Sequence, residues 1–387
     1  MSRVVPNTPT NRQETTVHPR VTDYTPHPQP IVVHEVVDEH TIRVPRFFRC
    51  TGTPPPPPPE KATTTFRGEL RSEQVDVAAR ALAGLRASGG CFLVLPTGFG
   101  KTVLAMYLAA ALGCTRVVVV TPTIVLKRQW IERSERFFDG GHVEATTVHS
   151  YDPFSATDLL VLDETHRYAA PTFSKIWKNE ALYVLGLSAT PDRADGTSVL
   201  LDWICGPRVT SSVLEAPKTQ VTVEVMFTGV LHAVDHHSVF LTKLATDRAR
   251  TAKIVARIRD MRDALVVSHR RQQCRDIHDA LANQGKDVGL MIGGSHDVPP
   301  NSIIVGTYSM VSEGFDCPRL SSLVLCTPIS APEQIVGRIL RTPGKKLVVD
   351  VVDDGPIARA QYAKRRAVYL ARGYNVTANR QEWAFID

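Results

Sequence analysis

The sequence predicts an α/β protein with two successive domains, each built on a parallel sheet, after a short proline-rich extension. Two observations predict this fold class. Short β-branched runs alternate with helical stretches from about residue 66, and the alternation starts again after residue 220. A chain of 387 residues, 43% of them hydrophobic, can also bury more core than one ordinary domain requires. We place the extension at residues 1–61, the first domain at 62–216 and the second at 217–387.

The extension is rich in proline and threonine and ends in an unbroken proline run, Pro54–Pro59. Such a run favours an extended polyproline II spacer. Two upstream β-branched segments, Ile31–Val33 and Thr41–Val44, can pair as a short hairpin. A disordered tail with local strand propensity explains the same residues equally well, so both interpretations stay open.

Eight apolar runs are the expected strands of the two sheets. They are 91–95, 116–121, 159–162 and 183–187 in the first domain, and 264–267, 302–305, 322–326 and 347–351 in the second. Between the domains, Val209–Thr228 contains Pro217 and then alternates apolar and polar residues. That pattern suits a crossing linker that becomes an edge strand of the second sheet.

Composition narrows the class of protein only slightly. Lys and Arg number 45 against 39 Asp and Glu, and the resulting charge of +6 is compatible with a polyanionic partner without requiring one. The seven cysteines include no C-x-x-C pair, which indicates reduced thiols. No apolar stretch is long enough to span a bilayer, and no signal peptide is visible. We therefore expect a soluble, intracellular protein with no membrane partner.

The segment 96–102, Pro-Thr-Gly-Phe-Gly-Lys-Thr, has the context that a phosphate-binding loop requires, between a buried strand and a helix. Gly98 and Gly100 allow the backbone to curl so that its N–H groups point at phosphate oxygens. Lys101 supplies charge to the β- and γ-phosphates, and Thr102 can bind Mg²⁺ through its hydroxyl. The segment therefore predicts a nucleotide site.

One position weakens the phosphate-loop match. Leu95 stands where the general G-x-x-x-x-G-K-[ST] pattern begins with glycine. A glycine-containing turn from strand to helix is the alternative interpretation.

Asp163-Glu-Thr-His166 directly follows the apolar run Leu159–Leu162, so its carboxylates should lie at the carboxyl end of a buried strand, beside the phosphate loop. Asp163 can hold Mg²⁺, and Glu164 can orient and deprotonate the water that attacks the γ-phosphate. Alone, such a pair is more often a charge cluster at a helix N-terminus. After a phosphate loop, it is a second independent indication of nucleotide hydrolysis.

These residues carry a resemblance to a known family. Asp163-Glu-Thr-His166 resembles the D-E-x-H box of superfamily 2 helicases, and Ser188-Ala-Thr190 resembles their coupling motif. Upstream, Arg71-Ser-Glu-Gln74 resembles their R-x-x-Q element, whose Gln reads the adenine edge. Thr121-Pro-Thr123 and Thr146-Thr-Val-His149 resemble the loops that hold the phosphates of one nucleic-acid strand.

The second half continues the motif order. The polar residues of Gln334-Ile-Val-Gly-Arg-Ile-Leu-Arg341 are spaced so that they would share one face of a helix. The segment resembles the Q-x-x-G-R-x-x-R motif, whose arginines reach the γ-phosphate; a solvated basic helix face is the alternative. Gly306-Thr307 and Glu313-Gly-Phe-Asp316 resemble the motif that contacts nucleic acid through Thr and the nucleotide through Gly and Asp.

The resemblance runs from about residue 66 to 374 and implies two tandem RecA-like domains, ATP as substrate and Mg²⁺ as cofactor. Catalysis would fall to Lys101, Asp163, Glu164, Arg338 and Arg341. Further ATP contacts would come from Arg71, Gln74, Pro96, Thr97, Gly98, Phe99, Gly100, Thr102, Gly314 and Asp316, with Thr102 and Asp163 on the metal. Coupling would involve His166, Ser188, Thr190 and Gln334, and nucleic-acid contacts Pro122, Thr123, Thr147 and Thr307.

The function implied is an ATP-dependent nucleic-acid motor, foremost a 3′–5′ DNA helicase or duplex translocase acting on duplex or branched DNA. The branch it is most similar to serves bacteriophages and large DNA viruses and includes the poxvirus transcript-release helicase and the phage recombination helicase. A viral protein would act in the host cytoplasm or the virion. A transcript-release or duplex-remodelling ATPase and an RNA helicase remain alternatives, while intact charged motifs argue against a non-catalytic scaffold. Protein partners and oligomeric state stay open.

Overall fold

The computed structural model describes residues 2–21, 27–49, 64–96, 98–169, 176–193, 195–211, 220–232, 236–293, 298–312, 315, 317–329, 332–340, 342 and 344–378. The chain divides into two compact units, Met1–Leu214 and Glu215–Asp387. Several predicted features lie outside the described residues: Pro54–Pro59, Thr97, Gly314, Asp316, Arg341 and the side chain of Gln334.

Unit 1 is organised around a parallel six-stranded sheet in the order β10-β8-β11-β12-β7-β13. In chain order the strands are β7 (Gly90–Val94), β8 (Arg116–Thr121), β10 (His142–Thr147), β11 (Leu159–Asp163), β12 (Tyr183–Ser188) and β13 (Arg208–Thr210). The four strands predicted from sequence form the centre of this sheet. The two that sequence analysis missed, β10 and β13, are its edges, where half-exposed polar residues obscure an apolar run.

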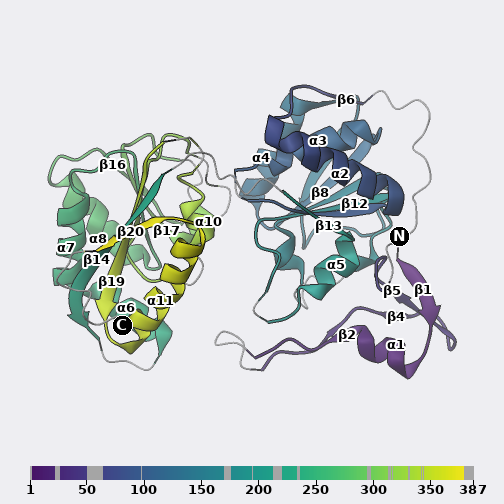
Figure 1. Ribbon diagram of the computed structural model, residues 1–387, viewed down its shortest axis with the longest axis horizontal. Helices are drawn as coiled ribbons and strands as arrows, with labels where there is room; N and C mark the ends of the chain where they lie inside the picture. Colours follow the sequence, from purple (N-terminus) through teal and green to yellow (C-terminus); the bar gives the residue numbers. More distant parts are fainter. Residues whose placement is uncertain are drawn as a thin grey trace. The chain divides into compact units, whose positions relative to one another are not determined.

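Helices cover both faces of this sheet (Figure 1). One face packs against α2 (Ser72–Ser88), α3 (Lys101–Ala111) and α4 (Ile124–Phe137). The other packs against α5 (Val199–Cys205) and the 3₁₀ turn η1 (Thr165–Tyr168). A short antiparallel pair, β6 (Thr65–Phe66) with β9 (Phe138–Asp139), adjoins α3. The central strands are buried on both sides, which explains their near-continuous apolar sequence.

The described part of the N-terminal extension is folded and packs on unit 1. It contains β1 (Arg3–Pro6), α1 (Pro9–Glu14), β2 (Thr16–Val17), β3 (Ile31–Val32), β4 (Glu35–Val36) and β5 (Thr41–Val44). The predicted pairing of Ile31–Val33 with Thr41–Val44 does not occur. Instead β5 pairs with β4 and β1, and β3 pairs with β2. A tight turn at Asp38, whose carboxylate accepts the N–H groups of His40 and Thr41, brings the nearer segment β4 into register first.

Apolar anchors attach the extension to the unit. Ile31 and Val33 are buried in the cluster on the α5 side of the sheet. Phe47 sits against Gly90 and Gly206, where any side chain on either glycine would collide with its ring. Arg46 donates to the carbonyl of Leu182 at 2.8 Å. Residues 27–49 are therefore part of the core of unit 1 rather than an appended tail.

Unit 2 contains a parallel seven-stranded sheet in the order β16-β17-β15-β18-β19-β14-β20. Its strands are β14 (Val221–Leu231), β15 (Ala264–Ser268), β16 (Val288–Met291), β17 (Ile303–Thr307), β18 (Ser322–Leu325), β19 (Lys346–Asp354) and β20 (Asn375–Ala378). The four strands predicted for this half are present. The prediction that the segment after Gln220 forms an edge strand is wrong, because β20 pairs along the outer side of β14.

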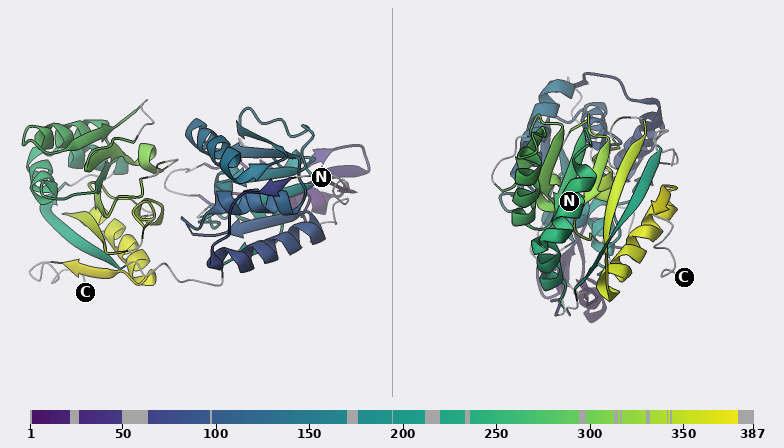
Figure 2. Two further views of the ribbon diagram at one scale, coloured as in Figure 1. Left: turned by 90° about the horizontal axis from the view of Figure 1, so that it is seen from above. Right: turned by 90° about the vertical axis from the view of Figure 1, so that its left-hand side faces the viewer.

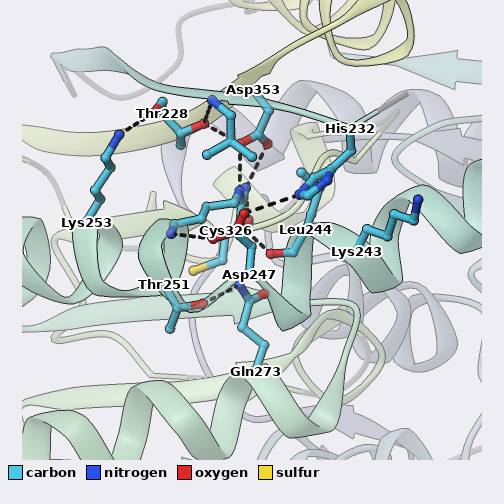
Figure 3. Close-up of polar contacts among 12 residues, drawn as sticks. Thr228, His232, Lys243, Leu244, Asp247, Thr251, Lys253, Gln273, Cys326 and Asp353 are labelled. Atoms are coloured by element: carbon cyan, nitrogen blue, oxygen red, sulfur yellow. Dashed lines mark hydrogen bonds and ion pairs between the residues drawn. The ribbon is translucent and has the colours of Figure 1, made fainter. Parts of the chain in front are cut away.

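The sheet of unit 2 lies between two helical layers, as the right-hand view of Figure 2 shows. On one face lie α7 (Arg248–Ile258) and α8 (Arg271–Ala282), and on the other lies α11 (Pro356–Ala371). Shorter helices are α6 (His237–Thr246), α9 (Tyr308–Ser312) and α10 (Glu333–Val336). Fully buried ion pairs join both helical layers to β19: Arg250 with Asp353 and Arg365 with Asp350. Figure 3 shows the network around Asp353.

Six of the cysteines lie in the described residues, and all six are buried free thiols. Across the described ranges, no helix is both long enough and apolar enough to cross a membrane.

Candidate nucleotide site

The predicted catalytic residues of unit 1 lie at the carboxyl ends of three neighbouring strands. The loop after β7 carries the phosphate-loop residues, Asp163 ends β11, and Ser188 ends β12. One strand, β12, lies between the strands of the loop and of Asp163. The carboxyl edge of a parallel sheet is where α/β proteins bind ligands.

The phosphate loop has the backbone that the sequence predicts. Gly98 and Gly100 have φ values of 84° and 86°, in the left-handed region that glycine adopts without strain. Lys101 begins α3, and its Nζ donates to the carbonyl of Leu95 at 3.0 Å. The N–H of Leu95 in turn donates to the carbonyl of Ser188 at 2.9 Å. Leu95, which replaces the usual first glycine, therefore ties the loop to β12.

The R-x-x-Q element contacts the phosphate loop directly. Gln74 is almost fully buried, and its Nε2 donates to the Phe99 carbonyl at 2.7 Å while its Oε1 accepts the N–H of Arg71 at 2.9 Å. The Arg71 guanidinium also donates to the carbonyls of Gly98 and Phe99. The Phe99 side chain is buried in the core. The hydrogen bonds from Arg71 and Gln74 fix the backbone of the phosphate loop. The contact of Gln74 with adenine stays a prediction.

Asp163 is a buried carboxylate held by two neutral donors. Its Oδ2 accepts the indole N–H of Trp130 at 2.7 Å, and its Oδ1 accepts the backbone N–H of Glu164 at 3.0 Å. Burial, and then the charge of Glu164, raise the pKa of Asp163 to about 6, although the Trp130 hydrogen bond and Lys101 oppose the shift. The site therefore concentrates negative charge that a cation would relieve.

Glu164 adopts a conformation that is costly for a residue with a side chain. Its φ of 50° lies in the left-handed region, and such strain persists where the surrounding structure imposes it, often at functional sites. Its Oε2 is buried and accepts no hydrogen bond from the residues that the structure describes, although it lies 3.5 Å from Nδ1 of His166. Burial lowers the pKa of His166, so its imidazole is neutral at pH 7. The Glu164 carboxylate is therefore not paired with a charged imidazole and can still accept a hydrogen bond or a proton.

The three coupling residues predicted for unit 1 are in contact. His166 Nδ1 lies 3.1 Å from Ser188 Oγ, and that oxygen accepts the N–H of Thr190 at 3.2 Å. Thr165, to which the sequence assigned no role, is fully buried between the two strands. Its hydroxyl accepts the N–H of Leu187 at 2.7 Å. The box and the coupling motif thus form one hydrogen-bonded unit.

The oxygen donors at this edge suit Mg²⁺. Magnesium prefers hydroxyl, carboxylate and phosphate oxygens and is usually held by one or two protein ligands plus a nucleotide. Thr102 and Asp163 are the predicted pair, and Oε2 of Glu164, which has no hydrogen-bond partner among the described residues, is a further acceptor. In the described part of the chain, no cluster of three His, Cys, Asp or Glu side chains could hold a metal alone.

The nucleic-acid residues predicted for unit 1 lie along the same edge. Thr121 and Thr147 are paired at the ends of β8 and β10. Pro122 and Thr123 follow β8, and the Thr123 side chain caps α4 by accepting the N–H of Leu126. One edge of the unit 1 sheet thus holds both the residues predicted to contact nucleic acid and those predicted to contact the nucleotide.

In unit 2 the structure corrects the predicted helix of the arginine motif. Helix α10 ends at Val336, and tighter turns follow, with the N–H of Arg338 donating to Ile335 O at 3.0 Å. Gly337 is a weak helix former, which accounts for the early end. The buried Arg338 donates to the carbonyl of Phe315 at 3.2 Å. Thr307 ends β17, with its hydroxyl 3.2 Å from that of Ser309.

Sequence reasoning missed three side chains that contact the site of unit 1. Trp130 binds Asp163, Arg133 approaches Thr102 with Nη1 3.4 Å from its hydroxyl, and Arg193 donates to the His166 carbonyl at 2.7 Å. None belongs to a motif that was sought. The only sequence signal is that a tryptophan and an arginine lie three residues apart on one helix face.

Comparisons with known proteins find relatives for the part of the chain that carries this candidate site. Residues 67–155 and 142–193 match the family described as Type III restriction enzyme, res subunit. L396 of Acanthamoeba polyphaga mimivirus, whose name places it among ATP-dependent RNA helicases, is 27% identical over 81% of this chain and 70% of its own length. DNA 3′-5′ translocase XPB2 of Sulfurisphaera tokodaii is 34% identical over 36% of this chain and 35% of its own.

The fold has a counterpart among solved structures. The Hef helicase domain of Pyrococcus furiosus superposes with a TM-score of 0.51 at 16% identity, covering 76% of this chain and 98% of that one. These likenesses support an ATP-hydrolysing enzyme of the helicase type with RecA-like parallel-sheet domains, and the chain is similar to superfamily 2 helicases. It is similar as well to helicases named in further large DNA viruses and in a bacteriophage.

Proposed function

We propose that this motor acts on DNA, as a 3′–5′ helicase or duplex translocase, with Mg²⁺·ATP as its fuel. The observation that supports the proposal best is the carboxyl edge of the unit 1 sheet. There the residues predicted to contact ATP and those predicted to contact nucleic acid follow neighbouring β-strands. The name of the archaeal translocase relative supports both DNA and the polarity.

The chemistry proposed for unit 1 follows from its donors. The N–H groups around Gly98 and Gly100, together with Lys101, bind the β- and γ-phosphates. Thr102 and Asp163 hold Mg²⁺, which would offset phosphate charge when bound. Glu164 orients the attacking water and accepts its proton through the oxygen that has no hydrogen-bond partner.

Unit 2 contributes the remaining predicted groups. We assign Arg338 and Arg341 to the γ-phosphate, because guanidinium is permanently charged and can donate bidentately to phosphate oxygens. Arg341→Ala should lower turnover without a comparable loss of ATP affinity, which single-turnover hydrolysis and nucleotide binding would measure together. An equal loss of both quantities would contradict a role confined to the transition state.

The test of the substrate is ATP hydrolysis measured in parallel with single-stranded DNA, duplex DNA and RNA. Stimulation by DNA is expected, and displacement of strands from 3′- and 5′-tailed duplexes would then report polarity and unwinding. Stimulation by duplex without displacement would indicate a translocase or remodelling ATPase. Stimulation by RNA alone would replace the proposal with an RNA helicase, the activity in the name of the mimivirus relative.

Salt dependence tests how the strand is held. The predicted contacts of Thr123, Thr147 and Thr307 fall on backbone phosphates, so binding should be largely independent of sequence and should weaken steeply as salt rises. Affinity for oligonucleotides of two unrelated sequences, measured across a salt series, would check this. A flat response would contradict a phosphate-tracking groove.

A further inference from the structure

Helix α4 contacts both predicted metal ligands from one of its faces. Trp130 donates its indole N–H to Asp163 Oδ2 at 2.7 Å. One turn later, Arg133 places Nη1 3.4 Å from the hydroxyl of Thr102. Residues three apart on a helix are neighbours on its surface. A helix with no assigned role in hydrolysis thus reaches both groups that would hold Mg²⁺.

Trp130 has the properties of a positioning residue. It is only 2% exposed and packs within the core cluster that also contains α3 and the central strands. The indole can only donate, so it cannot itself bind a cation. It occupies Oδ2 of Asp163 while the Glu164 N–H occupies Oδ1, and one donor on each oxygen fixes the plane of the carboxylate. The remaining lone pairs then have a defined direction for a metal or its water.

The same helix begins at a predicted nucleic-acid contact. Thr123 caps α4, and its carbonyl accepts the Thr121 hydroxyl at 3.0 Å, which fixes the helix start to β8. From Thr123 to Trp130 the helix rises roughly 10 Å. Because α4 is one continuous helix between these residues, a displacement of its start would reach the indole.

We propose that α4 links nucleic-acid binding to the metal site, with Trp130 as the residue that positions Asp163. The inference rests on the proposed function and adds a route by which a bound strand alters hydrolysis. Loss of the indole N–H should weaken the metal site without removing any metal ligand. Hydrogen-bond partners of metal ligands typically change metal affinity by about 10- to 100-fold.

The experiment compares Trp130→Phe with the parent chain. The variant should need about tenfold more Mg²⁺ for half-maximal hydrolysis and should show a smaller stimulation by the nucleic acid that activates the parent. A fluorescent ADP analogue provides a readout besides activity. Its affinity in EDTA should match the parent, and the gain in affinity on adding Mg²⁺ should shrink.

Two further variants make the result decisive. Trp177→Phe alters a tryptophan that is equally buried on the opposite face of the sheet, and it should behave as the parent. Arg133→Met removes the second contact of α4 with the site and should lower the stimulation by nucleic acid, which decides the matter if Trp130→Phe does not fold.

Parental Mg²⁺ dependence and parental stimulation in both α4 variants would overturn the link. A parent chain whose hydrolysis no nucleic acid stimulates would overturn the proposed function instead, so the two failures are distinguishable.

Discussion

Asp163 in unit 1 and Asp353 in unit 2 are both buried carboxylates at the carboxyl ends of parallel strands, yet their partners differ. Asp353 accepts from Arg250 Nε at 2.6 Å and Nη2 at 2.9 Å, and from the Thr228 hydroxyl at 2.5 Å (Figure 3). Asp163 accepts from a neutral indole and a backbone N–H. A guanidinium neutralises the first carboxylate, whereas neutral donors leave the second charged.

The difference distinguishes a buried carboxylate that stabilises the fold from one that is placed for a functional site. Arg250 also donates to the carbonyl of Cys326, the residue after β18, at 2.6 Å. The pair therefore joins α7 to β19 and to the end of β18, and its charges neutralise each other without a ligand. At Asp163 the cost of burial persists in the folded chain, as its raised pKa shows. Asp163 has no direct ion pair with the described residues, and Lys101 only partly offsets its charge, so a further cation can bind there.

Breaking the matched pair should have the largest effect on stability. Arg250→Met leaves the Asp353 carboxylate buried without its cation, which typically costs about 3–5 kcal/mol. Urea unfolding of the full chain, with hydrogen exchange of β14 and β19 amides to identify unit 2, would measure it. Arg257→Met is the control on the same helix, since its pair with Glu224 is about one-third exposed and should contribute under about 1 kcal/mol. Equal losses would mean that burial does not set the cost.

Removal of the Glu164 carboxylate, beside Asp163, should raise the free-energy barrier to hydrolysis by a similar amount. Glu164→Gln keeps the shape of the side chain but removes the proton acceptor, so turnover should fall by about 10²- to 10⁴-fold while ATP still binds. Single-turnover hydrolysis and nucleotide affinity are the measurements. Asp192→Asn, on an exposed side chain paired with Arg208, is the matched control. Hydrolysis at the parental rate in Glu164→Gln would remove that carboxylate from the mechanism.

Much of the fold was predictable because buried parallel strands are encoded as continuous apolar runs. The eight predicted strands lie in the two sheets, including β8 at its predicted bounds. The strands that escaped prediction, such as β10 and β20, carry half-exposed polar residues and depend on their neighbours for definition. The edge placement of β14 failed for the same reason, because β20 covers it.

The site was predictable where a local motif encodes it. The phosphate loop, the Asp163 box and the Ser188 motif lie together, because each follows a strand of the same parallel sheet. Trp130 could not be found in this way, because its contact with Asp163 joins residues 33 apart through the packing of α4. The start of the chain escaped for a similar reason: Phe47 is anchored by glycines more than 40 residues away.

Asp163→Asn should change stability in the opposite direction from a substitution at Asp353. Burial and the charge of Glu164 raise the pKa of Asp163 from 3.8 to about 6, so the folded chain binds this proton more tightly than the unfolded chain. Stability from this group is therefore complete below pH 4 and is lost as the pH rises through 6. Asparagine has no such loss, which is worth about 3 kcal/mol for this pKa shift. Its amide oxygen can still accept the Trp130 hydrogen bond, but its NH₂ group then faces the Glu164 N–H, and losing that hydrogen bond offsets about 1 kcal/mol of the gain.

At pH 8 without Mg²⁺, the Asp163→Asn variant should therefore be more stable than the parent by on the order of 2 kcal/mol, although inactive. The gain should disappear below pH 4, where the parent is protonated as well. Thermal unfolding of both proteins across this pH range would measure the difference. Asp353→Asn provides the contrast, because it leaves Arg250 buried without its counter-ion and should destabilise the chain at pH 8. If Asp163→Asn also destabilised the chain there, the carboxylate would be stabilised by its surroundings, and the distinction between the two buried acids would be lost.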